Sequence, residues 1–462
     1  MKKLQGAIAA ICGTVMMAGS MQAMADSTED IVHALVSKGV LTEEEGSLLL
    51  KGRAGEKEAQ EKSRKDNAVV KVGKKGLEVA SGDGNFTMKV GGRMHADFTS
   101  HDGDSDLRTR GGADTQATDG TDIRRARISI SGTILKDFEY MIEPEFAGSG
   151  GFRDLFLSYQ GFEPFELTVG HQKHAMSMEI QESSNDIMFT ERSLLQALTI
   201  PFFDRAIGVN LKASGEIWNI QGGVYGDSFT SNISNRREGS GWAVRGTVAP
   251  VLSDTKVVHL GANLGEREAN AEAEPNSSTS AARLRNETTN MSDLFLTDTG
   301  NIANFNKIKL GILEASAMYG PFSVQSEFAK GRVERDAGSD LDFDGFYVQA
   351  GWTLTGESRT YSAKDGEFKR LKPKSPFSLE KGNWGAWEVA ARYDQIDLDD
   401  ENIRGGEQKR ATLALNWYLN ENVRLMADYY RSFDLEDSPI LTRTGGEPDS
   451  IDVFNVRAQW AF

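Results

Sequence analysis

The last twelve residues of the chain alternate between apolar and polar side chains. One face of this period-two pattern is apolar and carries Phe454, Val456, Ala458, Trp460 and Phe462. The other face is mostly polar and carries Val453, Asn455, Arg457 and Gln459. A half-buried strand of a soluble sandwich would alternate in the same way. A final strand with one apolar and one polar face that ends on an aromatic residue is also typical of the closing strand of an outer-membrane β-barrel.

The same alternation recurs along most of the chain, interrupted by turn signals. We predict about sixteen strands, near residues 86–98, 122–134, 138–147, 152–160, 165–171, 206–213, 217–226, 241–249, 256–265, 307–319, 322–333, 343–355, 385–395, 408–419, 422–433 and 451–462. An even number of this size is expected for a single-chain outer-membrane barrel. The predicted fold is therefore all-β, a transmembrane antiparallel β-barrel.

The connections between these strands alternate between short turns and long polar stretches. The short turns are residues 136–137, 161–164, 214–216, 320–321 and 420–422, and the long stretches are 99–121, 227–240, 266–306 and 434–450. Short turns on the periplasmic side and long loops outside are the usual asymmetry of such barrels. The segment 356–384, rich in Lys and Arg, is an exception, because its position predicts a long connection on the periplasmic side.

Side-chain period predicts which residues face lipid and which face the lumen. In strand 408–419 we expect Leu413 and Leu415 to face lipid while Thr412 and Asn416 face inward. A charge on the lipid face near the midplane costs ~2–4 kcal/mol, which enforces this separation. Aromatic residues near strand ends fit interfacial girdles: Tyr159, Trp242, Trp352, Trp387, Tyr393, Tyr429 and Trp460.

The amino terminus has the features of a secretory signal peptide. Lys2 and Lys3 precede a mostly apolar run over residues 4–17, and the tripeptide at 23–25 (AMA) is a small-residue cleavage site. We predict a signal peptide over residues 1–25. It contains the only cysteine, Cys12, so the mature chain would have no disulfide.

Residues 26–67 are predicted to be helical. A shared apolar face runs over residues 31–36, Gly39 stands where a helix would end, and Thr42 with Glu45 forms a capping box. The predicted organisation is thus a periplasmic helical segment at 26–67 followed by the barrel domain at 68–462. The helices are interpreted as a tethered hairpin without chemistry of its own, or alternatively as a self-association segment.

Net charge and the absence of catalytic motifs reduce the number of functions that the sequence allows. Formal net charge is -16, and removing the signal's two lysines leaves 50 basic against 68 acidic residues, or -18. This balance weighs against nucleic acid as a partner, although only lumen charges would matter to a solute in a pore. His171 and His174 lack a third metal ligand, and no nucleophile, base and orienting group can be assembled. We therefore expect no enzymatic activity, metal or cofactor.

Several short segments together resemble the family of phosphate-selective porins O and P. The residues that carry the resemblance are Ile123-Arg124-Arg125-Ala126-Arg127, Val169-Gly170-His171-Gln172-Lys173, 183–186, 191–194, Tyr319-Gly320-Pro321-Phe322-Ser323-Val324-Gln325, 354–357 with Arg359 and Tyr361, Gly385-Ala386-Trp387-Glu388, and Asn416-Trp417-Tyr418-Leu419-Asn420. The resemblance implies a homotrimer of sixteen-stranded barrels in the bacterial outer membrane, each in contact with membrane lipid. It also implies selectivity for small anions, with phosphate or polyphosphate as the usual solute.

In porins that this chain resembles, the loop after strand 165–171 folds into the barrel and narrows it. Here that loop is 172–205, a length that usually means function or disorder. It carries Lys173, His174, Arg192 and Arg205, but no lysine beyond its start, and Asn185 stands where a lysine is expected in tight phosphate binders. This departure argues more against tight phosphate binding than against a pore.

A phosphate path requires several fixed donors spread along the lumen, because a single deep well would trap the ion. The strongest cluster is Arg124, Arg125 and Arg127, although Arg124 has the wrong parity for the inward face and is retained because it lies near the rim. The other predicted pore-lining residues are Lys89, Arg93, Lys173, Arg192, Arg205 and Arg245, with Arg392, Arg424 and Arg457 as further inward arginines.

A competing interpretation is that inward arginines pair with inward acids such as Glu139, Glu143, Glu145 and Glu388 and shape the lumen without selecting a solute. We predict a porin for passive diffusion of small anions. The alternatives are a general or cation-tolerant porin, or a structural envelope barrel.

Overall fold

The computed structural model describes residues 27–74, 76–103, 107–148, 150–226, 239–268 and 282–462. The predicted signal peptide lies outside the described residues and stays a prediction. The chain divides into two compact units, one comprising the residues through Val69 with 80–84, and the other comprising 70–79 and 85–462.

The first unit contains two helices, α2 (Ser27–Ser37) and α3 (Glu43–Asp66). Gly39 has a φ of +70°, a left-handed conformation that suits glycine after a helix end. The capping box at α3 is present: the Thr42 backbone N–H donates to Glu45 Oε2 at 2.9 Å, and the Glu45 N–H donates to Thr42 Oγ1 at 3.2 Å. Hydrogen bonds from the Thr42 backbone and side chain lower the pKa of Glu45. The predicted helices are thus confirmed. None of the helices in the described ranges has the length and apolarity needed to cross a membrane.

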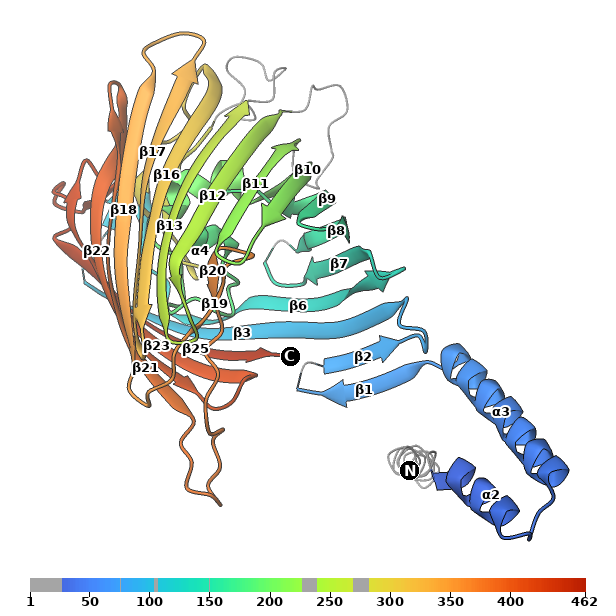
Figure 1. Ribbon diagram of the computed structural model, residues 1–462. Helices are drawn as coiled ribbons and strands as arrows, with labels where there is room; N and C mark the ends of the chain where they lie inside the picture. Colours follow the sequence, from blue (N-terminus) through green and yellow to red (C-terminus); the bar gives the residue numbers. More distant parts are fainter. Residues whose placement is uncertain (1–26, 75, 104–106, 149, 227–238, 269–281) are drawn as a thin grey trace, which may run out of the picture. The chain divides into compact units, whose positions relative to one another are not determined.

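The second unit is a β-barrel (Figure 1). Within the described ranges, 16 strands form a closed antiparallel sheet, as predicted, because each pairs with the next and the last, β25, pairs with the first, β3. The strands are β3 (Thr87–Gly103), β6 (Gly120–Ile134), β7 (Phe138–Glu145), β8 (Gly151–Phe162), β9 (Phe165–Lys173), β10 (Arg205–Ser214), β11 (Trp218–Tyr225), β12 (Gly241–Leu252), β13 (Lys256–Glu268), β16 (Phe305–Tyr319), β17 (Phe322–Arg335), β18 (Leu341–Thr353), β21 (Ala386–Asp400), β22 (Ile403–Tyr418), β23 (Val423–Glu436) and β25 (Ser450–Ala461).

Shorter elements complete the unit. Hairpin β1 (Val69–Gly73) and β2 (Gly76–Ala80) precedes the barrel, and β2 pairs with β3. Three small sheets lie in the connections: β4 (Leu107–Thr109) with β5 (Asp114–Thr115) and β24 (Ile440–Thr442), β14 (Arg285–Thr289) with β15 (Ser292–Asp298), and β19 (Thr360–Ser362) with β20 (Glu367–Lys369). Helices α4 (Met178–Gln181) and α5 (Gln196–Phe203) lie between β9 and β10. We call the barrel end with the short connections the turn end, and the opposite end the loop end.

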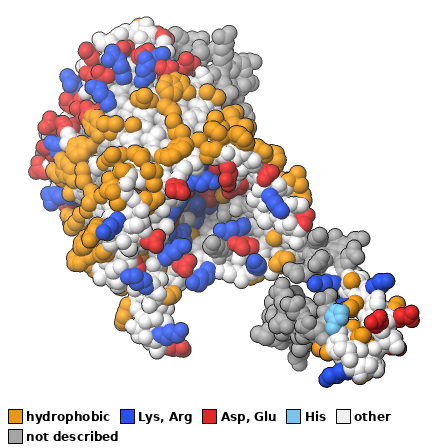
Figure 2. All heavy atoms as spheres, viewed as in Figure 1, with side chains coloured by type: hydrophobic (Ala, Val, Ile, Leu, Met, Phe, Trp, Pro, Cys, Tyr) orange, Lys and Arg blue, Asp and Glu red, His pale blue; other side chains and the backbone are white. Residues whose placement is uncertain are grey.

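The outer surface of the barrel is apolar where period-two alternation predicts it. Leu413 is 62% exposed while Asn416, on the opposite face of β22, is fully buried. Figure 2 shows hydrophobic side chains as a broad belt over the outer surface, with charged side chains gathered above it. The facing predictions for this strand are confirmed, because strand geometry sends successive side chains to opposite faces.

The connection between β9 and β10 folds into the barrel, as the family resemblance implies. The Leu194 N–H donates to Asp394 Oδ2 at 2.8 Å on β21, and the Met178 N–H donates to Glu327 Oε1 at 2.8 Å on β17. Apolar residues of this loop pack with inward-facing residues of β16, β17, β18 and β21 in one core: Leu194, Leu195, Leu198, Phe203, Ile308, Leu310, Ile312, Val333, Leu341, Phe343 and Ile396. The lumen wall is therefore not polar throughout, because the loop covers part of it.

The basic segment 356–384 also enters the barrel, from the turn end. Its hairpin β19–β20 presents backbone carbonyls of Asp365 and Gly366 to the Arg245 guanidinium at 3.0 and 2.6 Å. Tyr361 Oη lies 2.6 Å from His259 Nδ1 on β13, and Phe368 is fully buried. This segment is the long connection predicted at the turn end, and it fills part of the lumen.

Candidate functional site

A cavity of ≈ 840 Å³ lies between the wall strands β3 and β6–β10 and the inserted loop. Ten basic and eight acidic side chains line it. The basic residues are Arg93, Arg124, Arg125, Arg127, Arg153, Lys173, Arg192, Arg205, Lys212 and Lys369, and the acidic residues are Glu143, Glu145, Asp154, Glu166, Glu191, Asp204, Glu287 and Glu367. Despite the strongly acidic chain, this lining is slightly basic.

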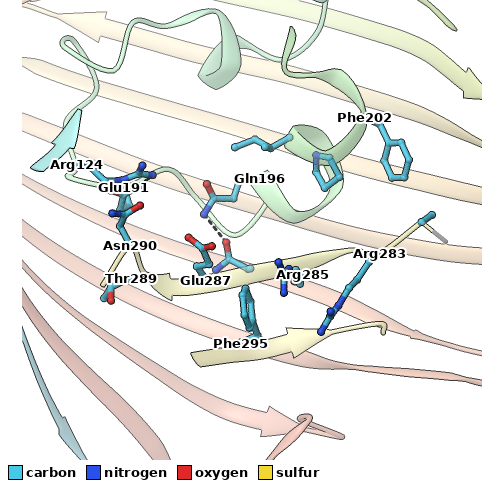
Figure 3. Close-up of a pocket in the computed structure, with 14 residues that line it drawn as sticks. Arg124, Glu191, Gln196, Phe202, Arg283, Arg285, Glu287, Thr289, Asn290 and Phe295 are labelled. Atoms are coloured by element: carbon cyan, nitrogen blue, oxygen red, sulfur yellow. Dashed lines mark hydrogen bonds and ion pairs between the residues drawn. The ribbon is translucent and has the colours of Figure 1, made fainter. Parts of the chain in front are cut away.

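A second hollow of ≈ 530 Å³ adjoins the cavity at the loop end (Figure 3). The two share the lining residues Arg124, Glu191, Gln196, Ile200, Glu287 and Asn290. Hairpin β14–β15 forms one side of this hollow, and the Arg285 guanidinium lies over the Phe295 ring at 4.0 Å. The hollow at the loop end and the central cavity are therefore neighbours.

A third hollow of ≈ 550 Å³ adjoins the cavity at the turn end. It shares Arg93 and Lys369 with the cavity. Its other basic side chains are Lys74, Lys89, Arg370 and Lys372. The three hollows thus lie next to one another in series, and basic side chains line each of them.

A β-bulge explains how Arg124 joins the lumen. In the pairing of β3 with β6, His95 lies opposite Arg125 and Ala96 lies opposite Ile123, so Arg124 is an extra residue in β6. A bulge of this kind re-aims side chains at one position of a strand. Strict alternation stops at the bulge, so Arg124 lines the cavity although its position in the strand period predicts the outer face.

Five of the predicted residues are paired with carboxylates. Arg93 contacts Glu143 at 2.8 Å, and Arg127 contacts Glu143 at 3.0 Å and Glu145 at 2.6 Å. Arg124 donates to both Glu191 oxygens at 2.8 and 3.0 Å. Arg205 contacts Asp154 and Asp204, both at 2.9 Å. Arg245 pairs with Glu314 at 2.8 Å. The pairing interpretation of the sequence is correct for these residues.

Three of the predicted inward arginines, Arg392, Arg424 and Arg457, line none of the three hollows. Arg245 does not line them either. It is fully buried, and the carbonyls of the inserted hairpin close it off from the cavity. Its role in the structure is to hold Glu314 and hairpin β19–β20, so we withdraw it as a pore-lining residue. The sequence placed it correctly on the inward face but contained no sign that the hairpin would cover it.

Four of the nine predicted pore-lining residues have no carboxylate partner within 4.0 Å among the side chains that the structure describes, and neither has the further inward arginine Arg424. Arg125 lies 3.4 Å from His95 Nδ1, and Lys173 Nζ donates to the Gln181 carbonyl at 2.6 Å. Arg192 donates to two carbonyls of its own loop at 3.0 Å. The fourth is Lys89, which lines the hollow at the turn end. These four cations line the hollows without a direct ion pair to a carboxylate among the described side chains.

Sequence reasoning missed three basic side chains of the cavity, Arg153, Lys212 and Lys369. Lys369 belongs to the basic segment 356–384, whose unusual length and charge were the available signal. Arg153 and Lys212 lie on strands β8 and β10, and both are bound to acids, Asp204 at 2.7 Å and Glu166 at 3.2 Å. Strand parity could have identified Lys212, which shares the inward face of β10 with Asn210. It could not have identified Arg153, which is the extra residue of a β-bulge in β8 opposite Glu143 and Pro144.

Glu191 is the acidic residue at the centre of the arginine cluster. Its carboxylate accepts from Arg124 and, at 2.9 Å, from Arg457. Burial by itself would raise the pKa of Glu191, but the guanidinium groups of Arg124, Arg125 and Arg457 hold that pKa well below its usual range. Glu191 is therefore an anion of the inserted loop, held against the wall.

The histidines form no metal site in the part of the chain that the structure describes, where no group of three His, Cys, Asp or Glu side chains is arranged to hold an ion. His95 contacts Asn185 Oδ1 at 2.9 Å, and His259 contacts Glu314 at 3.0 Å. Both rings lie within hydrogen-bond networks of the lumen wall.

The model of the family described as phosphate-selective porin O and P matches residues 88–462. The chain belongs to this family. It is a porin of the bacterial outer membrane, so the loop end faces the exterior and the turn end faces the periplasm. Among its relatives, Porin O of Pseudomonas aeruginosa is 29% identical over 426 residues, which cover 85% of this chain and 92% of the relative.

An uncharacterized protein of Caulobacter vibrioides is also 29% identical, over 76% of this chain and 69% of the relative. Solved structures support the same fold at lower identity. The anion-selective porin from Comamonas acidovorans matches with a TM-score of 0.51 and 14% identity, covering 82% of this chain and all of that one. A loop-deletion mutant of OmpT, an outer membrane protein of Vibrio cholerae, matches with a TM-score of 0.51 and 11% identity over the same shares.

Proposed function

We propose that this porin conducts small anions, with phosphate or polyphosphate as the preferred solutes, along the series of three hollows. The observation that carries the proposal is the set of four basic side chains without a carboxylate partner in the described structure: Lys89, Arg125, Lys173 and Arg192. Arginine offers planar bidentate contacts to phosphate, and lysine offers a mobile point charge.

The spacing of these groups fits a conducting path. Arg125, Lys173 and Arg192 line the central cavity, and Lys89 lies in the hollow at the periplasmic end. An anion that leaves one cation meets the next, so no single deep well holds it. A low-dielectric wall around such charges raises the local anion concentration.

The main alternative is a general or cation-tolerant porin. It is favoured by the eight acidic side chains in the same cavity and by the absence of a lysine at position 185, where Asn185 stands. Most of these acids are bound to arginine or lysine, which reduces their attraction for cations in the lumen. The adjoining hollows argue against a purely structural barrel.

We also propose the organisation that the family resemblance implies: a homotrimer embedded in outer-membrane lipid through its apolar belt. Residues 1–25 would be removed as a signal peptide, and helices α2 and α3 would lie in the periplasm. The first barrel strand, β3, begins at the turn end, which supports this topology. Chemical crosslinking of the unheated protein in outer membranes would test the trimer by yielding a three-subunit band.

The proposed function is tested by reversal potential in planar bilayers under a KCl gradient, followed by titration with phosphate at constant ionic strength. We expect chloride to dominate the current and phosphate to reduce it by binding along the path. A cation-selective or indifferent pore would refute anion conduction. Chloride selectivity without an effect of phosphate would refute the phosphate preference alone.

A further inference from the structure

The carboxylate of Glu191 occupies the point where donors from two wall strands meet. Arg124 of β6 binds both of its oxygens at 2.8 and 3.0 Å, and Arg457 of β25 binds one of them at 2.9 Å. These are the bidentate contacts that arginine makes with phosphate. Figure 3 shows Arg124 and Glu191 together at one side of the outer hollow.

Glu191 differs from the other acids of the cluster in its position. Asp97, Glu143 and Glu145 belong to wall strands, and Asp97 accepts from Nε and Nη2 of Arg457 at 2.7 and 2.6 Å. Glu191 belongs to the inserted loop, and its side chain is 15% exposed. It lines both the outer hollow and the central cavity. An anion passing from one to the other therefore meets this carboxylate.

We propose that Glu191 is a resident anion of the arginine cluster. A passing phosphate must either displace Glu191 from Arg124 or bind Arg124 together with it. This inference rests on the proposed function. A bound carboxylate satisfies the strong donors in the absence of solute. Each phosphate then gains only the difference between its own contacts and those of Glu191, so Glu191 lowers the affinity and shortens the dwell time of phosphate.

The same arrangement explains how a path lined by many arginines can still conduct anions rather than trap them. Arg124 has Glu191 as its carboxylate partner, while the neighbouring Arg125 has no carboxylate within 4.0 Å among the described side chains. Exchange of Glu191 for phosphate on Arg124, beside Arg125, would pass the anion inward in small steps. Glu191 thus determines how strongly the pore holds its solute.

The test is Glu191→Gln, measured by phosphate inhibition of chloride current through the full-length porin in planar bilayers. Glutamine keeps the size of the side chain but removes the charge that competes for Arg124. We expect the inhibition constant for phosphate to fall about tenfold, since charge-assisted hydrogen bonds become available to the solute.

Glu287→Gln is the matched control, because Glu287 lines the same two hollows and has no cationic partner within 4.0 Å among the described residues. It removes an equal charge, and we expect it to change the constant by less than about twofold. Equal effects of the two variants would show a general field effect and overturn the inference. An unchanged or weakened affinity in Glu191→Gln would also overturn it, leaving Glu191 as a group that only holds the arginines in place.

Glu191→Asp keeps the test available if the glutamine variant does not assemble. Its shorter side chain is unable to span both guanidinium groups, so phosphate should bind about two- to threefold more tightly than in the wild type. An unchanged constant in this variant would contradict the inference.

The wild-type measurement separates this inference from the proposed function. If phosphate inhibits neither the wild type nor Glu191→Gln, both are refuted. If only the variant is inhibited, the phosphate preference is wrong for the native pore, but the role of Glu191 as a competing anion is supported.

Discussion

Arg125 and Arg127 are adjacent inward side chains of β6 with opposite electrostatic surroundings, and they predict opposite results when replaced by glutamine. Arg127 is held by Glu143 at 3.0 Å and by Glu145 at 2.6 Å. Arg125 has only the His95 ring at 3.4 Å, with no carboxylate within 4.0 Å among the described residues. A solute anion therefore gains more from Arg125 than from Arg127.

The size of the effect follows from these contacts. A hydrogen bond to a charged group contributes about 1.5–3 kcal/mol, so Arg125→Gln should weaken phosphate binding roughly 10- to 150-fold. Arg127→Gln should weaken it by less than about threefold, because two carboxylates already compensate the Arg127 charge. It should instead destabilise the barrel by about 1–3 kcal/mol, since it removes a charged partner from Glu145 and Glu143.

Both quantities are measurable on the same preparations. Phosphate inhibition of chloride current gives the affinity, and the temperature at which the barrel loses its heat-modifiable migration on gels gives the stability. A larger loss of phosphate affinity in Arg127→Gln than in Arg125→Gln would refute the reasoning. The double substitution of both arginines is a poorer test, because the Arg127 change should reduce stability as well as permeability.

Three further outcomes are expected. Deleting the hairpin 360–369 should raise single-channel conductance, because it empties part of the lumen; unchanged conductance would mean that the hairpin does not restrict the path. Lys369→Gln with Lys372→Gln should weaken inhibition by phosphate added from the periplasmic side more than from the outside, as both line the hollow at that end; equal effects from the two sides would contradict this placement. Leu413→Arg should destabilise the barrel by up to ~2–4 kcal/mol in a refolding assay, whereas Leu413→Phe should be tolerated, since Leu413 is 62% exposed on the lipid-facing surface.

The sequence by itself determined the barrel, its strands and most of their facing. Alternation over residues 408–419 separated Leu413 from Asn416 correctly, and the capping box located the start of α3. These features depend on neighbours in the chain. Strand geometry fixes the period of two, and the cost of placing charge in lipid fixes which face is apolar and which is polar. Segments that resemble the porin family, such as residues 123–127, predicted small anions as the class of solute.

Only the tertiary structure decided which inward cations remain available to a solute. Arg457 meets Asp97, 360 positions away in the chain, and the inserted hairpin covers Arg245. The bulge turns Arg124 inward against the strand period. The side-chain period predicts only that a side chain points into the lumen. Its pairing depends on loops folded in from both ends, and no local pattern encodes that long-range packing.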